Sequence, residues 1–286
     1  PVRRLWGELL RVAFAAVFLV WWASYSMGVR PEPVAAAAAV IVVTLLVRAH
    51  ERRTLLPGAI AVAVAATAFA AHPIGIVAAA PLVVSIPMLW RIARERGTVV
   101  AALGRTVGVA ATSVVALLLA FSHGSLYGMI SSQQRFALVE EPQDWTNEIS
   151  RYGLLLADIP MGSYAKRIVV LVALVLLVWF LVYAAWLRRT AVFSAPVPLN
   201  LVAWAFGVSF ILMWITTSKW THHFGSLAAL GPLFIAAMCL VVPRLIGEHL
   251  PEGRRIPAWV APLIVASLFP VTILSLRAPD TWAYEW

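Results

Sequence analysis

The chain has 286 residues, of which 62% are hydrophobic and only 12% are charged, and its mean hydropathy is +0.88. Soluble domains carry about 25% charged residues, so this composition excludes a soluble globular protein and indicates an integral membrane protein. The formal net charge of +9 comes from basic residues spread over short segments between apolar runs, which excludes a nucleic-acid-binding domain. Because Cys239 is the single cysteine, an intrachain disulfide is also excluded.

Apolar runs recur along the chain and predict an all-α, polytopic transmembrane helical bundle of about nine spans. The predicted spans are 9–27, 33–47, 56–71, 74–90, 106–121, 168–187, 199–216, 225–243 and 257–276. Fifteen of the 22 lysine and arginine residues fall on one side of this arrangement, and the other seven fall on the opposite side. The positive-inside rule therefore places the N-terminus in the cytoplasm and makes residues 122–167 one long extracytoplasmic loop.

The turn after the first span contains Arg30 and Glu32 in the sequence Arg-Pro-Glu-Pro. Its two prolines interrupt helical structure and hold Glu32 in an extended turn. One interpretation is a solvated surface ion pair of little energetic value. The other is a guanidinium aimed at a lipid phosphate, because arginine matches phosphate geometry with two parallel hydrogen bonds.

Two features follow on the same predicted face. His72 and Pro73 break the chain between the third and fourth spans, where a lone histidine is more often structural than catalytic. Within the long loop, residues 144–156 predict a short interfacial helix. Its candidate acceptor-side residues are Trp145, Glu148, Arg151 and Tyr152, which offer an aromatic surface for a sugar and a carboxylate for hydroxyl groups. The alternative is a helix that only covers the bundle.

The segment 217–225 lies between two apolar runs and contains four candidate donor-binding residues, Lys219, Trp220, His222 and His223. An ammonium and two imidazoles beside hydrocarbon cost free energy unless an anionic or hydrogen-bonding partner meets them. A lipid-linked phosphate is one such partner; an interfacial tryptophan belt with a snorkelling lysine is the alternative. Adjacent histidines point to different faces of a helix, so we expect no metal site here.

The end of the chain carries an aromatic and acidic cluster in which Trp282 is a further acceptor-side candidate, or part of an interfacial belt. The sequence contains no nucleophile motif, no glycine-rich phosphate loop and no metal-spaced Cys/His set, and we expect no cofactor. The chain begins at Pro1 rather than at methionine, so we expect a fragment. The catalytic residues are unknown, and we expect the general base upstream of residue 1.

Taken together, the polar segments resemble the Emb arabinosyltransferases of the mycobacterial cell wall. The resemblance is strongest at residues 219–225, Lys-Trp-Thr-His-His-Phe-Gly, and at residues 29–33, where Val-Arg-Pro-Glu-Pro is similar to that family's Leu-Arg-Pro-Glu-Pro. Further similar segments lie at 72–75, 145–152, 162–167 and 282–284, so the resemblance extends over essentially the whole chain. The chain departs from the family pattern at Ser218, before the lysine, and at His72, where the family has glycine.

The resemblance implies that residues 1–286 are part of the transmembrane domain of a GT-C glycosyltransferase, without its N-terminal catalytic loop and C-terminal carbohydrate-binding module. It implies transfer of arabinofuranose from decaprenyl-phosphate-arabinose to the arabinan of arabinogalactan or lipoarabinomannan. The active face would be extracytoplasmic in a multi-pass protein of the plasma membrane. Arg30, Glu32, Lys219, Trp220, His222 and His223 would then bind the donor phosphate and sugar. We also expect contact with membrane lipids and a homo- or heterodimer with a paralogue.

Two other classes of function remain open. A polyprenyl-lipid transporter or flippase would place ionisable groups in mid-span facing a cavity, whereas here they gather at one rim. A non-catalytic membrane partner subunit fits a chain without a visible general base. The enzyme interpretation makes one geometric prediction, namely that Arg30 and the segment 219–223 lie at the same membrane surface.

Overall fold

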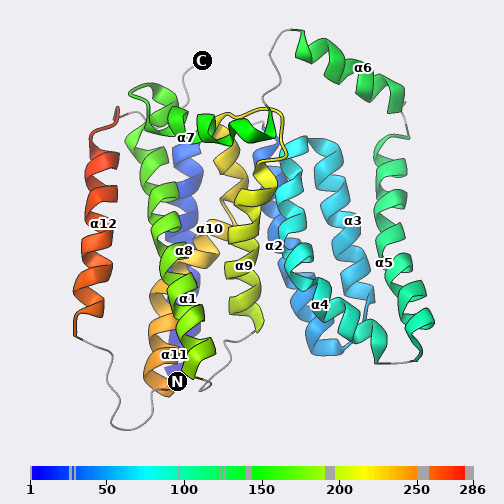
Figure 1. The fold of residues 1–286 in the computed structure, drawn as a ribbon, viewed down its shortest axis with the longest axis horizontal. Coiled ribbons are helices and arrows are strands. Elements are labelled where there is room, and N and C mark those ends of the chain that lie inside the picture. The colour runs from blue at the N-terminus through cyan, green and yellow to red at the C-terminus, as the bar shows by residue number, and fades with distance from the viewer. Residues whose placement is uncertain are drawn as a thin grey trace.

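The computed structural model describes residues 2–25, 28, 30–95, 97–122, 124, 126–138, 144–190, 197–249 and 258–280. Its regular secondary structure is helical throughout these ranges, and Figure 1 shows the long helices standing side by side. Six of the long elements are single helices: α1 (Val2–Tyr25), α2 (Glu32–Arg52), α3 (Leu56–Ala71), α5 (Val99–Ala120), α8 (Tyr164–Thr190) and α9 (Val197–Met213), and α12 (Val260–Leu276) is a seventh. Two more consist of consecutive helices, namely η1 (Pro73–Ala79) followed by α4 (Ala80–Arg94), and α10 (Leu230–Ala236) followed by η5 (Ala237–Val241) and α11 (Val242–His249). The predicted all-α bundle is confirmed.

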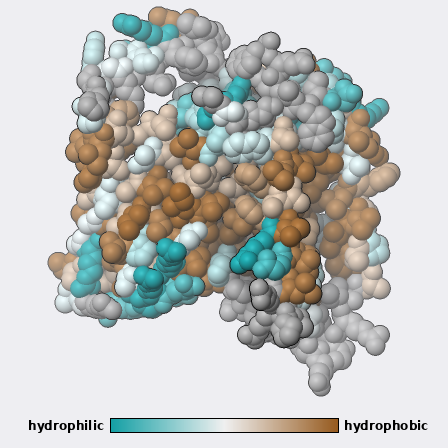
Figure 2. Space-filling view, turned by 180° about the vertical axis from the view of Figure 1, so that it is seen from behind, coloured by the Kyte–Doolittle hydropathy of each residue, from teal (hydrophilic) through white to brown (hydrophobic). Residues whose placement is uncertain are grey.

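The bundle has the dimensions and surface of a membrane domain. Among the described residues, six helical segments are long and apolar enough to cross a bilayer, namely Leu5–Tyr25, Glu32–Arg52, Pro73–Arg94, Val99–Ala120, Pro160–Trp186 and Leu230–Gly247. Three shorter apolar helices, Leu56–Ala71, Val197–Met213 and Val260–Leu276, occupy the positions of three further predicted spans. Figure 2 shows apolar residues across the middle of one face and polar residues towards its edges. The chain is therefore a multi-pass membrane protein, and nine crossings stay a prediction.

Local sequence explains where several helices begin and end. Glu32 is the first residue of α2, so the prediction that it lies in an extended turn is wrong. Pro31 and Pro33 flank it at the start of the helix, where a missing backbone N–H costs nothing. The same helix ends at Arg53, which adopts the left-handed conformation of a helix C-cap. At the start of α5 the hydroxyl of Thr98 accepts a hydrogen bond from the backbone N–H of Ala101 at 3.3 Å.

The long loop contains more structure than a connection. α6 (Leu126–Ala137) lies beyond the end of α5, and it was not predicted. The predicted interfacial helix is confirmed as η2 (Trp145–Glu148) followed by α7 (Ile149–Leu156), which lies across the end of the bundle in Figure 1. η3 (Pro160–Gly162) then leads into α8. α7 therefore covers one end of the bundle.

One buried side chain joins α1 to a residue 203 positions further along the chain. The Trp21 indole N–H donates to the carbonyl of Phe224 at 3.0 Å, and Trp21 is fully buried. Its ring lies directly over Gly231 of α10, where any Cβ would overlap the indole. Phe224 belongs to η4 (Thr221–Leu227), the short 3-10 helix between α9 and α10. This packing fixes η4 against the first span.

Candidate functional site

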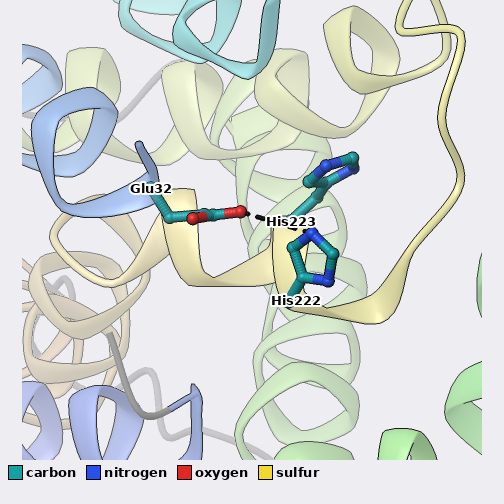
Figure 3. Close-up of side chains that lie close together, drawn as sticks. All are labelled: Glu32, His222 and His223. Atoms are coloured by element: carbon teal, nitrogen blue, oxygen red, sulfur yellow. Dashed lines mark ion pairs between the residues drawn. The ribbon is translucent and has the colours of Figure 1, made fainter. Parts of the chain in front are cut away.

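The site forms where the start of α2 meets η4. Glu32 is only 2% exposed, and one of its carboxylate oxygens, Oε1, lies 3.6 Å from Nε2 of His222. Figure 3 shows Glu32 pointing from α2 towards the two histidines of η4. The turn that carries Arg30 and the segment 219–223 therefore lie at the same end of the bundle, as the sequence predicted.

Aromatic rings surround His222. The His222 and His223 rings meet edge to face with centroids 4.6 Å apart, and Trp220 stacks on His222 at 6.3 Å with an interplanar angle of 13°. On the other side, His72 lies 6.0 Å from the ring of His223. The Nδ1 atom of His72 accepts the backbone N–H of Ile74 at 3.2 Å, so this side chain also caps η1. The three histidines thus form one cluster.

Burial keeps these imidazoles neutral. The pKa of His222 is lowered to about 3, first by burial and then by the positive charges of Arg30, Arg151 and Lys166. Burial likewise lowers the pKa of His223 well below its usual range, with Arg151 as the next cause. Near pH 7 each ring therefore offers one N–H donor and one lone pair.

Lys219 lies deeper than the sequence suggested. Its side chain is buried, and Nζ lies 3.1 Å from Oε2 of Glu148 and donates to the carbonyl of Trp214 at 2.8 Å. Arg151 binds the same carboxylate, with Nε 2.7 Å from Oε1. The Glu148 carboxylate therefore pairs with both Lys219 and Arg151. Both cations also donate to backbone carbonyls at the end of α9, Lys219 to Trp214 and Arg151 to Met213.

Lys166 is a residue of this region that the sequence analysis did not select. It lies in the first turn of α8, is fully buried, and donates from Nζ to the carbonyl of Pro160 at 2.7 Å. Its charge acts on His222, which places it in the same electrostatic neighbourhood. The sequence did contain a signal for Lys166. It and Lys219 are the only lysines in the chain, and a lysine beside apolar runs needs a partner for its ammonium group.

The described residues of this neighbourhood carry an excess of positive charge. Arg30, Arg151, Lys166 and Lys219 give four cations, and Glu32 and Glu148 give two carboxylates, which leaves a formal charge of +2. The second oxygen of Glu32, Oε2, is buried and has no hydrogen-bond partner among the described residues. An anion that also carries hydroxyl groups would satisfy both features.

Glu32, His222 and His223 also bring three possible metal-ligand atoms within 4.8 Å of one another. However, Nη1 of Arg151 lies 2.8 Å from Nδ1 of His223, and a guanidinium can only donate. That lone pair is therefore occupied, and the proton of the neutral ring lies on Nε2. The cluster then offers a cation two ligands, whereas zinc sites usually have at least three from protein, so we assign no metal.

The predicted acceptor-side residues differ in how far they are exposed. Glu148 and Arg151 are buried and bound to the protein, so they form a framework rather than a surface for a sugar. Tyr152 packs against Phe224 with ring centroids 5.6 Å apart, and burial raises its pKa to about 12. Trp145 is exposed, as an acceptor contact requires. Trp282 lies outside the described residues.

Known proteins resemble the chain over almost its whole length. The family described as "Mycobacterial cell wall arabinan synthesis protein" matches residues 7–286. Probable arabinosyltransferase B of Mycobacterium tuberculosis (strain ATCC 25618 / H37Rv) is 31% identical over 274 residues, which cover 95% of this chain and 24% of that protein. Probable arabinosyltransferase C of Mycobacterium leprae (strain TN) is 31% identical over 217 residues, 76% of this chain and 20% of that protein.

A solved structure shares the fold. The cryo-EM structure of arabinosyltransferase EmbB from Mycobacterium smegmatis superposes with a TM-score of 0.57 at 19% identity, covering 94% of this chain and 27% of that chain. The chain thus spans about a quarter of the length of the relatives that it matches. On the match to residues 7–286, this chain belongs to the family of mycobacterial cell wall arabinan synthesis proteins.

Proposed function

We propose that this chain forms the donor-binding part of a membrane arabinosyltransferase that acts in cell wall arabinan synthesis. The donor would be decaprenyl-phosphate-arabinose, and the acceptor would be the arabinan of arabinogalactan or lipoarabinomannan. The observation that carries the proposal is the charge of the rim around His222, where four cations and two carboxylates leave a formal excess of +2. Family membership supports the sugar, and the charge excess supports the phosphate.

The chemistry requires positive charge at the departing group. The bond between the anomeric carbon and the phosphate oxygen breaks, the phosphate leaves with the electron pair, and the acceptor oxygen bonds to that carbon. Arg30, with its phosphate-matching guanidinium, would stabilise the leaving phosphate, and the N–H of His222 would donate to it. The unpartnered Oε2 of Glu32 would accept a hydrogen bond from a sugar hydroxyl. The acceptor proton passes to a general base that none of these residues supplies.

Lys219 then acts indirectly. Because its ammonium is bound to Glu148 and to the Trp214 carbonyl, it holds the segment that presents Trp220 and His222. Trp220, stacked on His222, would lie beside the sugar or the prenyl chain. We place this rim on the extracytoplasmic side of the plasma membrane, because the arginine-rich turns lie at the opposite end of the bundle.

A transfer assay tests the proposal. Membranes that contain the intact protein would be supplied with labelled polyprenyl-phosphate-arabinose and an arabinan oligosaccharide. Arg30→Met should reduce transfer about a hundredfold, which is the scale found when one donor to a developing anion is removed. Arg135→Met, which removes an exposed arginine on α6, should leave transfer unchanged. Equal activity of the two variants would contradict the proposal.

A further inference from the structure

Arg151 of α7 is fully buried, although it lies in a short helix at the surface end of the bundle. Its Nε donates to Oε1 of Glu148 at 2.7 Å and its Nη2 donates to Oε2 at 3.3 Å. This two-bond pairing fixes the plane of the guanidinium. The second N–H of Nη2 and both N–H groups of Nη1 remain for the residues at and after the end of α9.

Those donors bind the segment between α9 and η4. Nη2 lies 3.2 Å from the Met213 carbonyl, 3.0 Å from the Thr216 hydroxyl and 3.3 Å from the Ser218 carbonyl. Nη1 donates to the Trp220 carbonyl at 3.1 Å. The last carbonyls of a helix lack intrahelical hydrogen-bond donors, and here the buried guanidinium of Arg151 provides donors for them. One side chain therefore contacts four of the residues between 213 and 220.

The same nitrogen Nη1 also donates to Nδ1 of His223 at 2.8 Å. Since the guanidinium has no lone pair to offer, Nδ1 must be the acceptor and the ring proton must lie on Nε2. The hydroxyl of Ser218, 3.4 Å from Nε2, is placed to receive it. Protonating the ring would put a hydrogen on Nδ1 directly against the guanidinium.

We infer that Arg151 is a positioning residue, which holds His223 as the neutral Nε2–H tautomer and so fixes which of its ring nitrogens is the hydrogen-bond donor next to Glu32 and His222. The tautomer follows from the geometry alone, whereas its importance for transfer rests on the proposed function. The titratable and charged groups that face His223 are Arg151 from α7, His72 from the start of η1, His222 from η4 and Glu32 from α2.

Nitrogen-15 NMR of the intact protein in lipid nanodiscs, labelled at histidine, tests the tautomer directly. The His223 signals would be identified by their loss in His223→Gln. We expect a protonated Nε2 and an unprotonated Nδ1 throughout the range from pH 5 to pH 8. A proton on Nδ1, or a doubly protonated ring at pH 7, would overturn the inference. This readout does not depend on arabinosyl transfer.

Three variants then test the role of Arg151, with folding monitored by size-exclusion chromatography. Arg151→Met removes the donor and the charge, so His223 should lose its single tautomer and the acid limb of the transfer profile should move up by about one pH unit. Arg151→Lys keeps the charge but not the paired donors, and it should not restore the tautomer. Arg135→Met should behave as wild type.

The outcomes separate the two claims. An unchanged His223 spectrum in a folded Arg151→Met protein would show that Arg151 does not set the tautomer. If that variant does not fold, the wild-type spectrum still decides whether Nε2 carries the proton. A correct tautomer in a protein that transfers no arabinose would contradict the proposed function and leave the assignment of Arg151 standing.

Discussion

Burial and the surrounding cations both lower the pKa of His222. The side chain is 13% exposed, and its pKa falls from 6.5 to about 3 in the folded protein. An unfolded chain therefore binds more protons than the folded protein between these two values, and stability decreases as the pH falls through this range. The imidazoles of His222 and His223 are therefore neutral near pH 7.

This difference predicts acid-sensitive stability. Lowering the pH from 7 to 5 should decrease the unfolding temperature in detergent, with His222 accounting for at most about 2 kcal/mol at pH 5. His222→Gln, which cannot titrate, should show a shallower decrease. Unfolding followed by intrinsic fluorescence at several pH values would measure both slopes, and identical slopes would exclude His222 as a cause.

Glu148 holds the two buried cations of the framework, and its removal leaves both without their carboxylate. Breaking a buried pair in this way typically costs about 3–5 kcal/mol. We therefore expect Glu148→Gln to lower the unfolding temperature strongly. Glu8→Gln is the matched control, because Glu8 pairs with Arg11 on the exposed surface of α1, where such pairs contribute less than about 1 kcal/mol. Similar unfolding temperatures for both variants would refute this role.

At the scale of helices, the break between α3 and η1 depends on one close approach. A Cβ on Gly75 would overlap the backbone carbonyl of Ala68, which cannot move without disturbing α3. Gly75→Ala should therefore destabilise the protein by about 1–3 kcal/mol and displace His72. Gly108→Ala in α5 has open space around it and should be neutral or slightly stabilising. Thermal unfolding of the two variants in detergent compares them directly.

Helix positions were largely predictable, because a run of apolar residues must satisfy its backbone within a helix when it crosses a bilayer. The interfacial helix predicted at 144–156 was also visible from its aromatic and aliphatic spacing. α6 was not, since its residues 126–137 mix serine, glutamine and apolar residues without a clear boundary. The short length of α9 was missed too, because Trp214 and Ile215 extend the apolar run beyond the last helical residue, Met213.

The candidate site was predictable only in part, for a physical reason. Sequence shows that Lys219, His222 and His223 need partners, but not which carbonyls remain open at the end of α9. Arg151 and Lys219 satisfy those carbonyls, so the residues that looked like ligands are partly framework. The contact of Glu32 with His222 spans 190 residues of sequence and arises only when α2 packs beside η4.

For the molecule as a whole, the charge pattern predicts its orientation in the membrane. Ile149 on α7 and Glu51 near the end of α2 are exposed at opposite ends of the bundle. In a background without other reactive cysteines, Ile149→Cys should react with an impermeant maleimide on intact cells. Glu51→Cys should react only after permeabilisation. The reverse pattern would place the site in the cytoplasm.

We propose that the positively charged rim around Glu32 and His222 binds a lipid-borne phosphate. Calorimetric titration of the intact protein with a short-chain polyprenyl phosphate in detergent measures this directly. We expect Arg30→Met to raise the Kd at least about tenfold, a loss of roughly 1.4 kcal/mol, while Arg135→Met leaves the Kd unchanged. Equal affinity of wild type and Arg30→Met for the polyprenyl phosphate would contradict the account.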